Sequence, residues 1–152
     1  MFEWLENTSV ALWVGESLWA YPIMLSMHVI GLAIVVGILS MLDFKLLGGF
    51  KGIRTGSFLP LIKFAWIGFL INAVSGVFLF TSQASYFVTS TTFLTKLACI
   101  FVGAVLTKVI QGKLVVAEAA GSADDVGIKG LAIFSLLLWL VAITAGRLTA
   151  YI

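Results

Sequence analysis

Long uncharged runs alternate with short charged segments along this chain. No charged residue occurs between Glu16 and Asp43, or between Lys63 and Lys96. A helix that crosses the ~30 Å hydrocarbon layer of a bilayer needs about 20 mainly apolar residues. Both runs are long enough for one such helix. They predict membrane spans at about 19–42 and 61–81.

Two further apolar stretches are bounded or interrupted by basic residues. One stretch contains Lys96 and Lys108, whose positions are ~18 Å apart along a helix that rises 1.5 Å per residue. Lysine stems can extend along apolar surface toward the interface, so both ammonium groups can approach water. Another stretch ends at Arg147. The pattern predicts spans at about 93–113 and 130–147, in a single transmembrane domain over 1–152.

Composition agrees with a membrane protein. Of the 152 residues, 61% are hydrophobic and 11% are charged, whereas soluble domains have roughly 25% charged residues. The mean hydropathy is +1.15. The net charge is +2 and the basic residues are scattered, which gives no sign of a nucleic-acid partner. The expected fold is all-α, an integral membrane four-helix bundle embedded in the lipid bilayer.

The basic residues also predict an orientation. Most of them lie in the connections between the first and second spans and between the third and fourth, or in the span ends beside these connections, which the positive-inside rule assigns to the cytoplasm. Both termini are therefore expected outside, in a multi-pass protein of the bacterial inner membrane. The N-terminal acids Glu3 and Glu6 occupy positions where a cleaved signal carries Lys or Arg. The segment 8–19 mixes tryptophan with polar residues and predicts an amphipathic helix on the outer surface.

The loops give weaker signals. Residues 48–57 are glycine-rich, but no strand precedes them and the spacing is not that of a phosphate-binding loop. Residues 118–127 predict a flexible turn. At the end of the first span, Asp43 is expected to form a solvated pair with Lys45.

His28 is the only histidine, and it lies inside the first span. An ionisable residue within a membrane helix is costly and suggests a function. Tyr21 and Gly31 share its helical face at i−7 and i+3, and the glycine leaves room for a flat macrocycle or a close helix. His28 is therefore a candidate haem ligand. The alternatives are a neutral histidine bonded to a neighbouring helix, and a residue for proton or metal transfer.

Lys96 and Arg147 are expected near the same membrane boundary as His28, which lies ~12 Å inside its own span at 1.5 Å per residue. A haem on His28 would place its propionates near this boundary, where the two cations could pair with them. Alternatively, Lys96 extends to lipid phosphate, and Arg147 pairs with Glu16 or ends the fourth helix.

Asn72 is the other polar residue well inside a span. Gly68, Asn72 and Gly76 recur every four residues and so share one helical face. Such a stripe is typical of close helix packing with an interhelical hydrogen bond. A position beside a cofactor or a pore is the alternative.

The stretches MLSMHVIGLAIVVGILSMLDFKLLG and FLTKLACIFVGAVL resemble a superfamily of small bacterial membrane proteins. It includes the membrane-bound protoporphyrinogen oxidase type and the copper-resistance D type. The pattern TrpAlaTyrPro at 19–22 is similar to uncharacterised four-helix members. The resemblance covers about 40 residues and implies a haem-b-like role for His28 and a polar role for Lys96. With one histidine, the chain departs from multi-haem and copper-transport members.

The leading expectation is therefore an integral membrane protein that binds one haem b through His28. Its role would be electron transfer, or redox sensing, at the outer leaflet, and the sequence does not decide whether it is an enzyme. Two alternatives remain: a cofactor-free accessory subunit of a membrane complex, and a small transporter or channel using Asn72 and His28. Glycine-rich helix faces favour a homo-oligomer or a place in a larger complex.

Overall fold

The computed structural model describes residues 2–123, 127–149 and 151, and every regular element among them is a helix. Four of the helices are long and apolar enough to cross a membrane, which confirms the all-helical class and the expected number of long apolar helices. These are α3 (Ala20–Leu46), α4 (Leu59–Ser82) with the preceding 3₁₀ turn η1 (Thr55–Phe58), α6 (Thr91–Ala119) and α7 (Lys129–Leu148).

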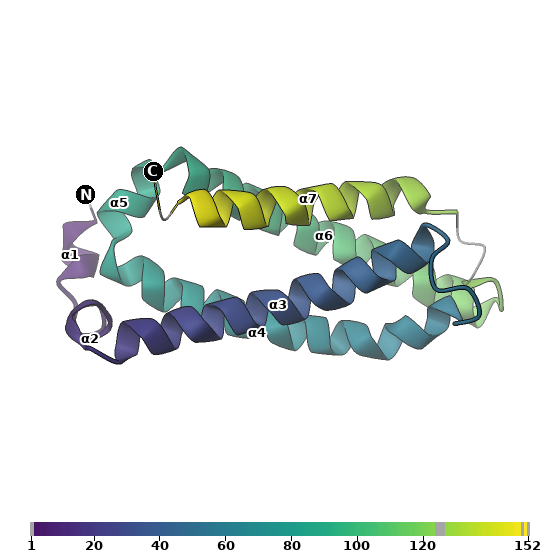
Figure 1. Ribbon diagram of the computed structural model, residues 1–152, viewed down its shortest axis with the longest axis horizontal. Coiled ribbons are helices and arrows are strands. Elements are labelled where there is room, and N and C mark those ends of the chain that lie inside the picture. Colours follow the sequence, from purple (N-terminus) through teal and green to yellow (C-terminus); the bar gives the residue numbers. More distant parts are fainter. Residues whose placement is uncertain (1, 124–126, 150, 152) are drawn as a thin grey trace.

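The long helices run lengthwise beside one another as two hairpins (Figure 1). Helix α3 packs chiefly on α4, and α6 packs chiefly on α7. Both ends of the chain lie at one end of the bundle, here called the terminal end (Figure 1). The opposite end, where α3 connects to η1 and α6 to α7, is called the loop end. Three short helices are found at the terminal end: α1 (Glu3–Glu6), α2 (Ser9–Glu16) and α5 (Ala84–Thr89).

Local signals explain where several helices begin and end. Ser90 begins α6, since its hydroxyl accepts a hydrogen bond from the Phe93 N–H at 3.3 Å. Helix α4 begins with a proline in its first turn. After α3, Gly48 adopts a φ of +100°, a left-handed conformation that glycine tolerates and that terminates helices.

Three boundaries differ from the sequence prediction. Helix α3 continues four residues beyond the expected end at 42. Helix α6 extends to Ala119, into the expected turn 118–127, of which 124–126 lie outside the described residues. A short helix, α5, occupies part of the polar connection between the second and third spans. Polar residues can remain helical at a membrane boundary, because backbone hydrogen bonds are satisfied within the helix.

Helices α3 and α4 approach each other closely at two glycines. A Cβ built on Gly31 would lie 2.7 Å from both the Asn72 nitrogen and the Gly68 oxygen. A Cβ on Gly68 would lie 2.7 Å from the Ile34 side chain. Membrane helices associate through such small residues, because lipid supplies no hydrophobic drive for association. The space beside Gly31 is therefore filled by the backbone of α4, and a close helix explains this glycine.

The two hairpins are packed together unevenly. Between 21 and 30 of α3, and between 91 and 102 of α6, every residue keeps some exposed surface. The terminal half of the bundle is therefore the more loosely packed half. The largest buried cluster lies in the loop half and consists of Leu42, Phe58, Ile62, Leu106, Ile110, Leu114 and Ile128.

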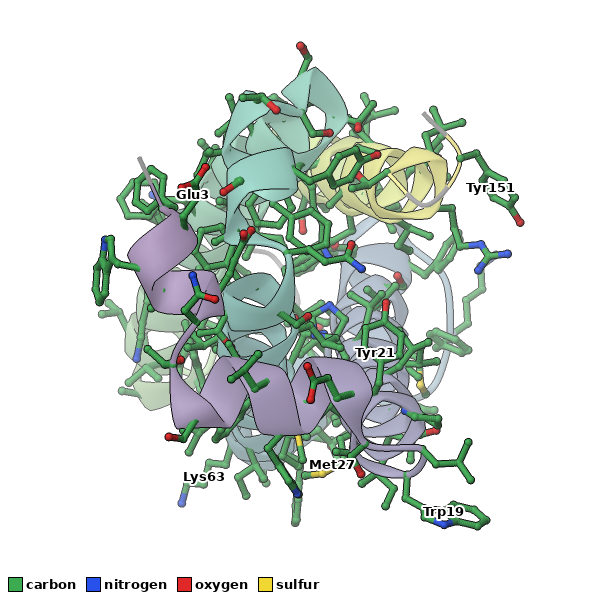
Figure 2. All side chains as sticks on the ribbon, turned by 90° about the vertical axis from the view of Figure 1, so that its left-hand side faces the viewer. Glu3, Trp19, Tyr21, Met27, Lys63 and Tyr151 are labelled. Atoms are coloured by element: carbon green, nitrogen blue, oxygen red, sulfur yellow. The ribbon has the colours of Figure 1, made fainter. Side chains whose placement is uncertain are left out.

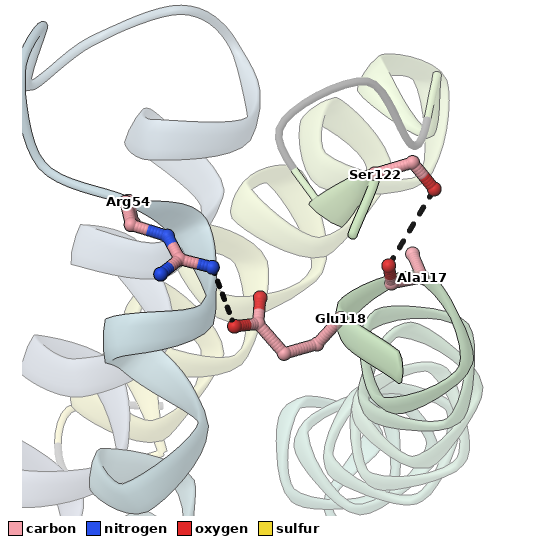
Figure 3. A network of polar contacts seen from close by, with 4 residues as sticks. All are labelled: Arg54, Ala117, Glu118 and Ser122. Carbon is pink, nitrogen blue, oxygen red and sulfur yellow. Dashed lines mark hydrogen bonds and ion pairs between the residues drawn. The ribbon is translucent and has the colours of Figure 1, made fainter. Parts of the chain in front are cut away.

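Polar contacts at the loop end include one ion pair. Arg54 donates to Glu118 at 2.9 Å and so connects η1 to the end of α6 (Figure 3). The arginine side chain is 73% exposed, so this pair contributes less than about 1 kcal/mol. The predicted solvation of Asp43 is wrong, since this residue is only 1% exposed. Helix α3 continues past it, and helix α7 covers it.

The short helix α2 packs against the ends of α3 and α4. Its Ala11 and Val14 are buried, whereas Trp13 on the same helix is exposed. Trp19, just before α3, points away from the bundle (Figure 2). Helix α2 thus packs one face against the bundle and leaves the opposite face exposed.

Replacing Gly31 with alanine tests the close approach of α3 and α4. The added methyl would meet backbone atoms that no side-chain rotation can move, so the helices must separate. We expect a loss of about 1–3 kcal/mol in the free energy of unfolding, measured in mixed detergent micelles. Gly37→Ala is the matched control, because a Cβ there meets nothing within 4 Å. Equal effects of the two substitutions would contradict this packing.

Candidate functional site

His28 is held from both sides of its imidazole ring. It lies eight residues after the start of α3 and is partly buried. Its Nδ1 is 2.9 Å from the backbone oxygen of Asn72 on α4. A carbonyl oxygen can only accept, so Nδ1 carries the proton and donates it. In the neutral ring this leaves Nε2 with a free lone pair, as an acceptor or a ligand atom.

Asn72 ties the same two helices together in the opposite direction. Its amide Nδ2 donates to the backbone oxygen of His28 at 2.7 Å. Asn72 is 7% exposed, so this bond is shielded from water. The interhelical hydrogen bond expected from the glycine stripe is thus present. This bond fixes the position of His28 along the helix axis, relative to the Asn72 carbonyl oxygen that accepts the hydrogen bond from Nδ1.

Ser75 and Gly76 complete the contact on α4. The Ser75 hydroxyl lies 3.3 Å from Nδ1 of His28, and 2.7 Å from the Ile71 oxygen to which it donates. A Cβ on Gly76 would lie 3.1 Å from Cε1 of the imidazole, so a larger residue there would push the ring by a few tenths of an ångström. Two residues of the predicted stripe on α4 therefore contact the histidine directly. Asn72 orients the imidazole, and Gly76 leaves space for it.

Lys96 approaches His28 from the other hairpin. Its Nζ lies 3.1 Å from Nε2, and because an ammonium group can only donate, Nε2 is the acceptor. The lysine stem passes over Gly146 of α7, where a Cβ would lie 3.3 Å from Cδ. A polar chain thus runs from the Asn72 carbonyl through the imidazole to Lys96. It crosses the loosely packed half of the bundle.

The structure does not bring every candidate residue to this chain of contacts. Arg147 is exposed, and its guanidinium donates to the Tyr151 hydroxyl at 3.3 Å. Tyr21 is partly buried, and its side chain points from the start of α3 toward the middle of the terminal end (Figure 2). Gly31 contacts α4 rather than an open space. His28, Asn72 and Lys96 therefore form the site.

The charge at this site is unusual. Within the described ranges no carboxylate lies within 4 Å of the Lys96 ammonium group. Its hydrogen-bond partner is instead a histidine ring with a free lone pair. The same part of the chain contains no group of three or more His, Cys, Asp or Glu side chains placed to bind a metal ion. A positive charge inside a span without a nearby acid favours an anionic ligand.

The four apolar helices define the class of protein: a multi-pass membrane protein. No family model, curated protein or solved structure matches the chain. The interpretation of the site therefore depends on its own geometry.

Sequence reasoning missed two features. It expected Lys96 near the membrane boundary, but not its hydrogen bond with His28, which depends on how the hairpins pack. It also passed over Ser75, although Ser75 directly precedes Gly76 and lies three residues after Asn72. The i+3 spacing from a buried asparagine is the signal that could have identified it.

The ring protonation can be tested directly, because the chain has one histidine. We expect ¹⁵N NMR of histidine-labelled protein to show a protonated Nδ1 and an unprotonated Nε2. In Lys96→Met the same tautomer should persist, since the Asn72 carbonyl rather than the lysine selects it. A proton found on Nε2 alone would contradict the assigned hydrogen bonds.

Proposed function

We propose that this protein binds a single haem b through Nε2 of His28 and serves electron transfer, or redox sensing, at the outer leaflet. The observation that carries the proposal is the bond from Nδ1 of His28 to the Asn72 carbonyl at 2.9 Å. Metal-ligating histidines commonly donate their second ring proton to a carbonyl or carboxylate. This contact fixes the tautomer and the ring orientation and makes the free nitrogen more basic.

The surroundings of Nε2 support the same proposal. Nε2 faces Lys96 in the loosely packed half between the hairpins, where residues 91–102 of α6 all keep exposed surface. A lysine side chain has four rotatable bonds, so Lys96 can leave Nε2 without any movement of the helix. Its charge then suits a propionate. Arg147, whose guanidinium donates to the Tyr151 hydroxyl in this structure, would have to turn inward to serve as the second candidate for a propionate.

Haem iron would supply one-electron chemistry, and its axial ligand and surroundings would set the reduction potential. The protein supplies an oriented ligand atom, a positive charge and an apolar shell. Association with further copies or with a larger complex would be one way to cover the exposed surface of the terminal half of the bundle.

The proposal includes an orientation. Most lysines and arginines lie toward the loop end, so both termini, with α2, face outward from a bacterial inner membrane. The exposed Trp13 and Trp19 suit an interface between lipid and water. The exposed face of α2 would then lie on the outer surface of the membrane.

The visible spectrum of the purified protein, oxidised and reduced, tests haem binding. We expect a Soret band with about one haem per chain, and its complete loss in His28→Gln, which keeps a polar side chain but not the imidazole. Lys96→Met should weaken haem binding about tenfold, equivalent to ~1.4 kcal/mol, through loss of a charge-assisted hydrogen bond. Lys108→Met is the matched control on α6, since Lys108 lies over the Trp66 ring, 4.3 Å from its centroid.

A folded, colourless wild-type protein, prepared with ample haem, would refute the haem proposal. Two results would then separate the alternatives. Ion or solute flux in liposomes that is abolished in Asn72→Leu would indicate a transporter or channel. Without flux, retention of a partner complex would indicate an accessory subunit.

Orientation is tested by single cysteines in a Cys99→Ser background. We expect a membrane-impermeant maleimide to label Asn7→Cys in intact spheroplasts and Ser57→Cys only after lysis. Both positions are exposed, at the terminal and loop ends respectively. The reverse pattern would show that the termini are cytoplasmic.

A further inference from the structure

Asp43 is a second ionisable group inside the bundle, far from His28. The two residues lie fifteen positions apart on α3, or ~22 Å at 1.5 Å per residue. Asp43 is 1% exposed, and Ser135 of α7, whose hydroxyl lies beside it, is 2% exposed. In the part of the chain that the structure describes, Oδ2 of Asp43 has no hydrogen-bond partner. The carboxyl group is thus buried between the two hairpins and only partly satisfied.

Charged groups on the neighbouring elements are directed elsewhere. On α3 itself, Lys45 lies two positions further on, about 200° around the helix, and so does not face the same side. On α4, Lys63 points outward from the bundle (Figure 2), and on α7, Lys129 is exposed. From η1's side, Arg54 pairs with Glu118 (Figure 3). Ser135 is therefore the polar group that α7 presents to Asp43.

The cost of charge decides between the two states of this carboxyl group. An ionised carboxylate that is buried with one neutral hydrogen bond loses several kcal/mol of hydration free energy, and no opposite charge compensates for this loss. The protonated acid is neutral, and it can both donate and accept a hydrogen bond. A bound Ca²⁺ would need six or more oxygen ligands, whereas Asp43 and Ser135 supply three. The neutral, protonated acid is therefore the favoured state.

We propose that Asp43 is a proton-binding site that joins α3 to α7 at the loop end. It carries its proton in the packed bundle, and its hydrogen bond with Ser135 links the two hairpins. Loss of the proton places a charge between α3 and α7 and drives them apart. The contact between the hairpins is then controlled by a proton, and this control is independent of any ligand on His28.

Infrared spectroscopy of the purified chain tests the proposal. We expect the C=O stretching band of one protonated carboxyl group per chain at neutral pH, shifted in D₂O and lost in Asp43→Asn. Ser135→Ala should keep the band but shift its frequency, because the hydrogen bond is removed. Glu118→Gln is the matched control and should leave the band unchanged, since Glu118 is a partly exposed carboxylate paired with Arg54.

The stability of the neutral variant gives a second, independent readout. Asp43→Asn should melt at or above the temperature of the wild type, because a neutral group of similar shape replaces a neutral acid. Two outcomes would overturn the proposal. One is a wild-type spectrum without a protonated-carboxyl band. The other is an Asp43→Asn variant that is strongly destabilised or fails to fold while Glu118→Gln folds normally, since Asp43 would then act as an ionised carboxylate.

Discussion

The close contact of α3 with α4 is the constraint on which the site depends. Gly31 and Gly68 let the two backbones approach within van der Waals distance, and the Asn72 amide then bonds the His28 carbonyl oxygen at 2.7 Å. Lipid does not compete for these hydrogen bonds, so they are more persistent than similar bonds at a wet surface. The position and tautomer of the imidazole follow from this contact rather than from His28 itself.

Uneven packing separates the two ends of the bundle. The loop half contains the larger cluster of buried aliphatic and aromatic side chains, including Ile62 and Leu114, which are fully buried. The terminal half is crossed by the polar chain from Asn72 to Lys96 and by stacked phenylalanine rings, of which Phe80 on α4 and Phe93 on α6 lie 5.8 Å apart. Stability is therefore concentrated away from the site, which leaves Lys96 and its surroundings free to rearrange at modest cost.

The bundle contains two ionisable centres with different surroundings. His28 has a partner on each ring nitrogen, one on α4 and one on α6. Asp43 has one oxygen without a partner and touches α7. Both centres connect the first hairpin to the second, one in each half of the molecule. Changes in charge at either centre would act on the same contact between the hairpins, although the chemistry of the two differs.

The sequence by itself determined the four long apolar helices, because runs of about 20 uncharged residues have few other stable forms in lipid. It also singled out His28, Asn72 and Lys96 as candidates, since polar residues inside such runs are costly and therefore conspicuous. Only the tertiary structure decided that Gly31 faces α4, that Arg147 turns to Tyr151, and that Asp43 is buried under α7. Periodicity gives the face of a helix on which a residue lies. Which helix packs against that face depends on how the two hairpins are arranged. That arrangement is set by contacts between segments far apart in the chain, such as the 68 positions that separate His28 from Lys96.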